Sequence, residues 1–435
     1  MKRSKVAMGS LAAVMLTLSA CSNAATEGQV STQVKETSGE KVELRAMWSG
    51  TTSRHERTLK VIELFEKKYP NIKITPEYTG TDQFGEKLNT QLAGGNAPDL
   101  INIGGITDLV VKDAVLDLTP YVKNKEINLD SIDPAYSDPG KMNDKYYGIS
   151  LGTNGIGLFY NNDLIKKAGM QPPKDTMSFE EYEAYGKEVV SKLGPGYYAF
   201  ADQSRYNLYF QYFLRQSGKS TYKDGKLDFT KDDVVRWFTM WDRMRKAGLL
   251  PTPEEAATYT DLSVDTSIFP KGKTVFMMSW LNQLTAYQNA MKDELQLTAL
   301  PSGGSGAKNG LWVHPSQFWT INKTSKHPKE AAMFINFFIN DEEATKVLGS
   351  ERGIPGSAKV RDMIKPTITP TEQKIYSYFE TYISKAGVKD PDLPNGAEYA
   401  NAMVSASQKV MFGKATIEQA AQEVMDAAEK TVNRK

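Results

Sequence analysis

The sequence predicts an α/β fold. From residue 41 onward, strand-like and helix-like segments alternate, which favours parallel strands joined by helical crossovers. The 435 residues are 40% hydrophobic and 24% charged, which is typical of a globular chain with roughly 100–200 residues in each of two or three domains. One Cys and three His exclude a disulfide framework and a multi-Cys zinc site. A formal net charge of +1 does not support nucleic-acid binding.

The first twenty residues are typical of a bacterial signal peptide. Three basic residues precede an uncharged segment, residues 6–20, that is shorter than the roughly 20 residues of a transmembrane helix. The segment ends Leu-Ser-Ala-Cys, which resembles a lipobox in which Cys21 would carry the lipid. Removal of the leader takes away three positive charges and no negative ones, so the net charge would become +1 − 3 = −2. The alternative is an ordinary secretory peptide followed by an incidental cysteine.

Residues 21–40 are predicted to form a flexible, lipid-anchored tether. Val30 and Val34 are the only sizeable apolar residues between Ser22 and Glu40, so the segment cannot bury enough surface to offset the entropy of ordering. A flexible chain of this length spans about 25 Å. An anchored domain could therefore diffuse over a membrane and still reach a membrane partner.

Residues 41–103 predict a β-α-β-α-β unit. Residues 41–48 and 72–78 read as strands, and residues 99–103 as a short buried strand. The first intervening helix is expected to begin at Ser53, which has capping-box spacing to Glu56, and the second covers residues 81–92.

The rest of the chain is richer in aromatic residues and helices. The sequence predicts strands within residues 148–161 and at residues 273–280, and a flexible glycine-rich loop at residues 302–310. The aromatic run at residues 206–213 is interpreted as core, not as a ligand platform. Capped or amphipathic helices are predicted to begin at Ser178, Asp232, Pro328, Ala397 and Thr416.

Common enzymatic motifs are absent. The sequence has no Gly-x-Ser-x-Gly elbow, no His-Glu-x-x-His and no phosphate-binding loop. The acidic pairs Asp232-Asp233 and Glu254-Glu255 are interpreted as helix N-termini, where negative charge is favourable. We therefore expect no enzymatic activity, catalytic residue, cofactor or metal site, although sequence alone does not exclude a glycosidase carboxylate pair.

Five segments carry a resemblance to a known family. They read VIELFEKKYPNIKITPEYTG, KLNTQLAGGNAPDL, YYGISLGTNGIGLFYNNDLIKKAG, FPKGKTVFMMSW and ERGIPGS. In this order they resemble extracellular solute-binding proteins of ABC sugar importers, the group that includes maltose-binding proteins, over residues 41–435.

The resemblance implies a two-lobed, periplasmic-binding-protein-like α/β fold of class II. A ligand cleft would lie between lobes that are joined by a hinge of several crossings. The N-terminal lobe is expected to comprise residues 41–153 and 311–358, and the C-terminal lobe residues 154–310 and 359–435. The implied function is a monomeric, lipid-anchored protein on the outer face of the cell membrane that passes an oligosaccharide to ABC permease subunits. A surface-anchored glycoside hydrolase and a module that binds another ligand, such as a peptide, remain open.

The resemblance also assigns ligand-binding residues. A sugar site needs aromatic rings for C–H faces and polar side chains for hydroxyl groups. Stacking rings are assigned to Tyr206 and Trp280, and Asn154 occupies a position where relatives carry a sugar-binding carboxylate. The Arg54-His55 pair points weakly to an acidic or acetamido sugar, although a solvated helix start would explain it equally well. The remaining candidates are Trp48, Ser49, Asn102, Asp108 (alternatively a helix cap), Trp312, His314, Gln317 and Glu398.

Overall fold

The computed structural model describes residues 41–433 except 261–263, 385, 391–392 and 394–395. The predicted signal peptide, Cys21 and the predicted tether lie outside the described residues.

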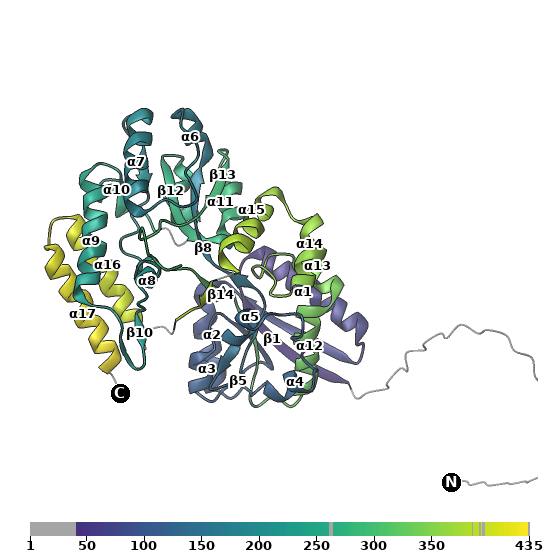
Figure 1. The fold of residues 1–435 in the computed structure, drawn as a ribbon. Helices are drawn as coiled ribbons and strands as arrows, with labels where there is room; N and C mark the ends of the chain where they lie inside the picture. The colour runs from purple at the N-terminus through teal and green to yellow at the C-terminus, as the bar shows by residue number, and fades with distance from the viewer. Residues whose placement is uncertain (1–40, 261–263, 385, 391–392, 394–395, 434–435) are drawn as a thin grey trace, which may run out of the picture. The chain divides into compact units, whose positions relative to one another are not determined.

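One group of elements is built on a five-stranded sheet in the order β2-β1-β3-β15-β6 (Figure 1). Strand β1 runs parallel to β2 and β3, whereas β15 runs antiparallel to β3 and β6. The predicted β-α-β-α-β unit is confirmed, and we call this group the first lobe. Its strands are β1 (Val42–Ser49), β2 (Ile72–Thr79), β3 (Leu100–Ile103), β6 (Ile149–Ser150) and β15 (Phe318–Ile321).

Helices cover this sheet because each has one apolar face. In α1, Val61, Ile62 and Phe65 are buried, and the Phe65 ring meets that of Phe334 at 5.2 Å. The helices of the first lobe are α1 (Thr52–Lys68), α2 (Thr81–Ala93), α3 (Thr107–Val111), α4 (Thr119–Lys123), α5 (Pro134–Ser137), α12 (Pro328–Asn340) and α13 (Glu342–Leu348). A small hairpin pairs β4 (Lys141–Met142) with β5 (Lys145–Tyr146).

The start of α1 differs from the prediction. Thr51, not Ser53, caps the helix, and its hydroxyl accepts the Arg54 N–H at 3.4 Å. Both side chains can cap, but β1 ends at Ser49, so the helix begins at the first capping residue that follows. As a consequence, Arg54 and His55 lie in the first turn of the helix, close to the end of β1.

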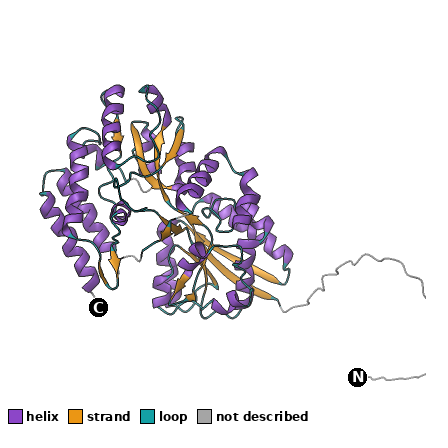
Figure 2. Ribbon diagram, in the orientation of Figure 1, coloured by secondary structure: helices purple, strands orange, loops and turns teal. Residues whose placement is uncertain are grey.

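The second group is built on a four-stranded sheet in the order β13-β8-β12-β9. Figure 2 shows strands in orange with helices in purple around them. Strand β12 runs parallel to β9 and antiparallel to β8, and we call this group the second lobe. Its strands are β8 (Ile156–Asn161), β9 (Tyr198–Phe200), β12 (Thr274–Trp280) and β13 (Leu295–Thr298). A short hairpin pairs β10 (Tyr222–Lys223) with β11 (Lys226–Leu227).

The helices of the second lobe carry most of the predicted caps. The capping boxes at Ser178 and Thr416 are confirmed, and the two acidic pairs lie in the first turns of α9 and α10. In the aromatic run, Tyr209, Phe210 and Tyr212 are core residues, as expected. The helices are α6 (Asn162–Lys167), α7 (Phe179–Leu193), α8 (Asn207–Gln216), α9 (Lys231–Lys246), α10 (Pro253–Ala256), α11 (Leu284–Ala290), α14 (Ala358–Ile364), α15 (Pro370–Tyr378), α16 (Ala397–Met411) and α17 (Ile417–Asn433).

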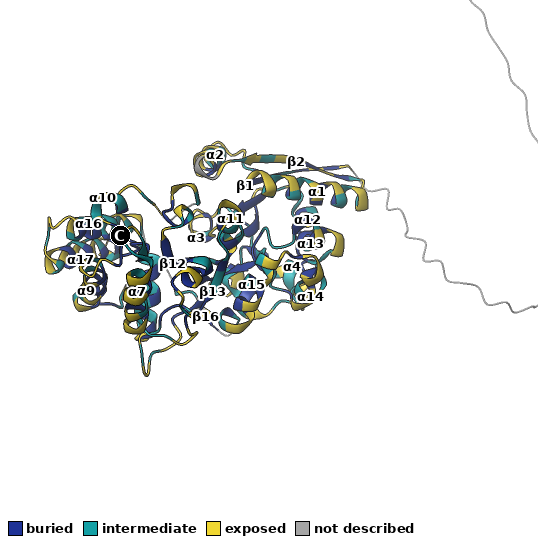
Figure 3. Ribbon diagram, turned by 90° about the horizontal axis from the view of Figure 1, so that it is seen from above, coloured by how far each residue is buried: buried dark blue, intermediate teal, exposed yellow. Residues whose placement is uncertain are grey.

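Strands from three distant parts of the chain pair where it crosses between the two sheets. They are β7 (Thr153–Asn154), β14 (Trp312–Pro315) and β16 (Gly387–Val388). Thr153 and Ile354 also exchange two backbone hydrogen bonds, of 2.6 and 2.8 Å. In the view from above, β12 is largely buried, whereas exposed residues lie on the outer helices and along β2 (Figure 3).

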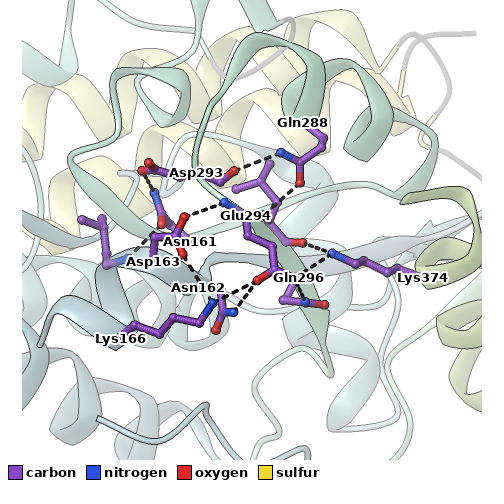
Figure 4. A network of polar contacts seen from close by, with 11 residues as sticks. Asn161, Asn162, Asp163, Lys166, Gln288, Asp293, Glu294, Gln296 and Lys374 are labelled. Atoms are coloured by element: carbon purple, nitrogen blue, oxygen red, sulfur yellow. Dashed lines mark hydrogen bonds and ion pairs between the residues drawn. The ribbon is translucent and has the colours of Figure 1, made fainter. Parts of the chain in front are cut away.

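A polar network surrounds the carboxyl end of β8, which is the end farther from Trp280 (Figure 4). Glu294 accepts hydrogen bonds from Asn162 at 2.8 Å and Lys166 at 3.2 Å, and these bonds lower its pKa to about 2. Trp280 pairs with Ile156 at the opposite end of β8. The network therefore fixes the sheet and α6, and it does not form part of the candidate site described below.

Candidate functional site

The candidate site lies at the carboxyl ends of parallel strands, where open α/β sheets bind their ligands. In the first lobe, the parallel strands β1 and β2 end at Ser49 and Thr79. In the second lobe, the parallel strands β9 and β12 end at Phe200 and Trp280.

The hinge strands, β7 and β14, where the chain crosses between the two sheets, bring together Trp280, His314 and Asn154. The rings of Trp280 and His314 lie 4.8 Å apart, and His314 pairs with Asn154 across β14 and β7. The Asn154 amide donates to Asn282 Oδ1 at 2.9 Å and accepts the Asn282 N–H at 3.3 Å. Asn282 was missed by the sequence analysis, although it follows Trp280 by two residues at the same strand end. This cluster offers an aromatic ring and two amides.

A second cluster joins Trp48, His55 and Tyr78 in the first lobe. Trp48 is fully buried, and its indole Nε1 donates to His55 Nδ1 at 3.0 Å. The Tyr78 ring lies 4.5 Å from His55 and 5.2 Å from Trp48, and Tyr78 is 45% exposed. Trp48 thus offers no surface to a ligand in this arrangement and supports the other two rings. Tyr78, which was missed, ends β2 directly beside Trp48, so its place at a strand end was a usable signal.

His55 is held in its neutral form. Burial lowers its pKa below the ordinary value of 6.5, and the charges of Arg352 and Arg54 lower it further. Because Nδ1 accepts the indole hydrogen bond, the neutral ring carries its proton on Nε2. His55 can therefore act as a hydrogen-bond donor on the rim of the site.

Asn102 and Gln317 bind a buried arginine that the sequence analysis missed. Arg352 donates to Asn102 Oδ1 at 2.8 Å, to Gln317 Oε1 at 2.5 Å and to Thr58 Oγ1 at 2.6 Å. Burial lowers the pKa of Arg352 to about 9, with a smaller contribution from Arg54. The bond between Asn102 and Arg352 ties β3 to the segment that carries Arg352. Asn102 is fully buried, so it offers no surface to a ligand here. Arg352 belongs to the ERGIPGS motif, which was noticed only for its turn.

A pocket of about 440 Å³ lies between the start of α1, the hinge strand β7 and helices α11 and α15. Arg54 lines it and is paired with Glu351, with 2.9 Å between Nε and Oε1. Asn154 and Asn282 line the same pocket, so it is continuous with the Trp280 cluster. Most of the residues that line the pocket are polar, and Arg54 and Glu351 form an ion pair in it.

Tyr206 is held close to the end of β12 by the loop that follows β9. The Gln203 side chain exchanges two 2.8 Å hydrogen bonds with the Met278 backbone, two residues before Trp280. Tyr206 then forms the N-cap of α8 and is half-buried, and the Arg205 guanidinium lies 5.3 Å from its ring centre. Of the two predicted stacking rings, Trp280 thus ends β12, and Tyr206 starts α8 after a loop that is bonded to β12.

The other predicted residues have different surroundings. Asp108 is exposed in the first turn of α3, but Ile106 is the N-cap residue and no side chain caps this helix, so the alternative interpretation of Asp108 as a helix cap is wrong. Trp312 is buried beneath the Arg215 guanidinium at 5.6 Å, and Glu398 is paired with Lys430 at 2.5 Å. Ser49 is buried at the end of β1.

The described part of the chain offers neither a metal-binding cluster nor a membrane-spanning helix. Within it, no group of three or more His, Cys, Asp or Glu side chains could hold a metal ion. No helix of that part is long and apolar enough to cross a membrane.

Comparison with known proteins identifies the family. A family described as bacterial extracellular solute-binding protein matches residues 60–375. The arabinooligosaccharide-binding protein of Bacillus subtilis is 23% identical over 322 residues, which cover 70% of this chain and 71% of that protein.

Solved structures give the same result. A family 1 extracellular solute-binding protein from Alicyclobacillus acidocaldarius is 29% identical, with a TM-score of 0.75 over 91% of this chain and 100% of that one. An oligogalacturonide-binding protein from Yersinia enterocolitica, solved with digalacturonic acid, is 26% identical, with a TM-score of 0.75 over 90% of this chain and 99% of that one. These similarities confirm the two-lobed α/β fold, and the chain belongs to the bacterial extracellular solute-binding proteins.

Proposed function

We propose that this protein binds an extracellular oligosaccharide and delivers it to the permease of an ABC importer. The observation that carries the proposal is the placement of three rings next to amide and imidazole groups: Trp280 and Tyr78 at carboxyl strand ends, and Tyr206 at the start of α8. Aromatic rings cover the C–H faces of sugar rings, and these polar groups bond to hydroxyls. The names of similar proteins, which include binders of arabino-oligosaccharides and oligogalacturonides, support the same ligand class.

Within this proposal, the residues have two roles. Trp280 and Tyr206 stack on the sugar, and His55, Asn154, Asn282 and His314 bond to its hydroxyls. Trp48, Asn102 and Gln317 hold these groups in place through their bonds to His55 and Arg352. Asn154 and Asn282 bond to each other but line the pocket, so they face the ligand.

The lobe boundaries are part of the proposal. Residues 41–153 and 311–358 would move as one body, and residues 154–310 and 359–435 as the other. The membership of β15 in the first sheet and of β8, β9, β12 and β13 in the second supports this division.

Binding without hydrolysis is the favoured activity. A glycosidase needs two carboxyl groups that flank the scissile bond. At the pocket, Glu351 is paired with Arg54, and Glu372 accepts hydrogen bonds from Ser350 and Thr369. Both carboxylates are therefore engaged in structural contacts.

We also propose that Cys21 carries a lipid and that residues 21–40 tether the domain to the outer face of the cell membrane. The sequence pattern around the only cysteine supports this assignment. A Cys21→Ser variant should then be released into the medium. Retention of that variant in the membrane fraction after a salt wash would refute the anchor while leaving sugar binding unaffected.

The ligand class is tested by thermal melting of the full chain against a panel of neutral and acidic oligosaccharides. A binder should melt at a higher temperature with its ligand and leave that ligand intact, as checked by chromatography of the same samples. New, shorter products would indicate a hydrolase. The absence of any shift across the panel would refute the proposed ligand class.

A further inference from the structure

The second lobe contains a buried arginine that has no carboxylate partner among the described residues. Arg205 is 8% exposed, and within the described part of the chain its side chain makes one hydrogen bond, from Nη2 to the backbone carbonyl of Ala256 at 3.3 Å. Its Nε has no partner. The remaining contact is with the Tyr206 ring, at 5.3 Å.

A neighbouring arginine shows the ordinary arrangement. Arg245 is also largely buried, but it is paired with Asp202 at 2.6 Å. Asp202 also accepts the Ser204 hydroxyl at 2.6 Å. The carboxylate nearest to Arg205 in the sequence is therefore already engaged, and the charge of Arg205 is not neutralised by it.

An unpaired buried charge is costly, because the lost hydration must be replaced by an opposite charge or by hydrogen bonds. For Arg205, one carbonyl and one aromatic face replace only part of the lost hydration. A bound anion would supply the rest, through the two-pronged geometry that guanidinium groups offer to carboxylates.

The start of α8 adds a second positive feature at the same place. This ten-residue helix begins directly after Tyr206, has no side-chain cap and has no acidic residue in its first turn. Its free N–H groups and its dipole therefore favour a negative charge next to Arg205.

Both features adjoin Tyr206, one of the proposed stacking rings. The loop that carries Arg205 is fixed to β12 by the Gln203–Met278 hydrogen bonds, two residues from Trp280. Tyr206, one of the two proposed stacking rings, directly follows Arg205. A sugar that is stacked on Tyr206 would thus place its substituents within reach of the guanidinium and of the start of α8.

We propose that Arg205 and the N-terminus of α8 bind a carboxylate of the ligand, so that the protein selects acidic oligosaccharides that contain uronic acid. This inference rests on the proposed sugar-binding function and narrows its substrate class. Arg205 is the specificity-determining residue, and Tyr206 orients the sugar ring that carries the carboxylate.

The first test uses the unmodified full chain. Isothermal titration compares digalacturonic acid with its dimethyl ester, which has the same rings but no charge. The acid should bind about tenfold more tightly or better, because a charge-assisted hydrogen bond is lost in the ester. Added salt should reduce this difference, as expected for an ionic contact.

The second test uses two variants with the same change in net charge. Arg205→Gln keeps a donor for the Ala256 carbonyl but removes the positive charge. Lys246→Gln removes an exposed charge on α9 that is paired only with Asp242. Arg205→Gln should weaken digalacturonic acid binding by about tenfold or more and leave ester binding within about threefold, whereas Lys246→Gln should change neither.

Each outcome decides the inference. Equal affinity for acid and ester, or an equal loss of both in Arg205→Gln, would overturn the charge-selective role. If neutral oligosaccharides bind and acidic ones do not, this inference fails and the proposed function stands. If no oligosaccharide of either kind binds, the proposed function fails as well. Should Arg205→Gln not fold, as judged by circular dichroism, the acid–ester comparison on the unmodified chain decides alone.

Discussion

The indole N–H of Trp48 donates to Nδ1 of His55 at 3.0 Å, and this bond links the core of the first lobe to the rim of the candidate site. Trp48 is fully buried at the end of β1, whereas His55 lies in the first turn of α1. A charged imidazole would carry protons on both nitrogens and could not accept this bond. The bond therefore favours the neutral ring with its proton on Nε2.

His55 is expected to titrate below pH 6.5, because burial and the charges of Arg352 and Arg54 disfavour its charged form. As the pH falls below 6.5, the unfolded chain binds this proton before the folded chain does, so stability is lost in that range. The chain has three His, and NMR titration of their ring protons can follow each one. The His55→Gln variant assigns the signal.

The same variant provides the stability control. Urea unfolding at pH 7.5 and pH 5.5 should show that the unmodified protein loses more stability on acidification than His55→Gln does. An imidazole pKa at or above 6.5 for His55 in the folded protein would contradict this prediction.

Trp280→Ala should weaken oligosaccharide binding by about tenfold or more while the apo melting temperature changes by only a few degrees. The ring is half-buried at the end of β12 and packs beside His314. Calorimetric titration and a melt of the same sample measure the two effects.

Trp319→Ala is the matched control. Trp319 is fully buried between Phe334 and Phe338, at 5.8 Å from each ring, so its removal should cost about 3–5 kcal/mol of stability. If Trp280→Ala loses comparable stability and keeps its affinity, Trp280 belongs to the core and not to the site.

The features that the sequence predicted well depend on local patterns. The capping box at Ser178 and the acidic first turns of α9 and α10 are set by residues a few positions apart. The strand that ends at Trp280 is marked by a short apolar run. Where two local solutions compete, the pattern is ambiguous, as at the start of α1, where Thr51 and Ser53 can both cap.

The remaining features depend on packing between distant segments. Trp48 and Tyr78 both end parallel strands, and only their positions in the packed sheet decide which ring is buried. Arg352 is likewise defined by acceptors from three distant segments: Thr58, Asn102 and Gln317. No spacing in the sequence connects these residues.

Arg352→Met should destabilise the first lobe by about 3–5 kcal/mol, because it removes the donor that three buried acceptors share. Urea unfolding measures the change. The control is Lys60→Met on α1, an exposed residue paired with Glu63, which should cost less than about 1 kcal/mol. A similar small loss for Arg352→Met would mean that the acceptors find other partners and that the network does not support the fold.

The two lobes are expected to close around a bound oligosaccharide. The chain crosses between the sheets at β7, at β14 and near Ile354, and these segments pair with one another through Asn154, His314 and Thr153. Such a hinge bends at a few residues while each sheet moves as a body. A ligand favours the closed state because only that state lets both lobes contact it.

Small-angle X-ray scattering should therefore show a smaller radius of gyration at saturating oligosaccharide than without it. Trp280→Ala, measured at the same sugar concentration, should show a smaller decrease, because weaker binding leaves more of the protein open. At a concentration that saturates the variant, the decrease should return. An unchanged radius in a sample that calorimetry shows to be saturated would mean that the sugar binds to a rigid site, and the proposed movement of residues 41–153 and 311–358 against the rest would then be wrong.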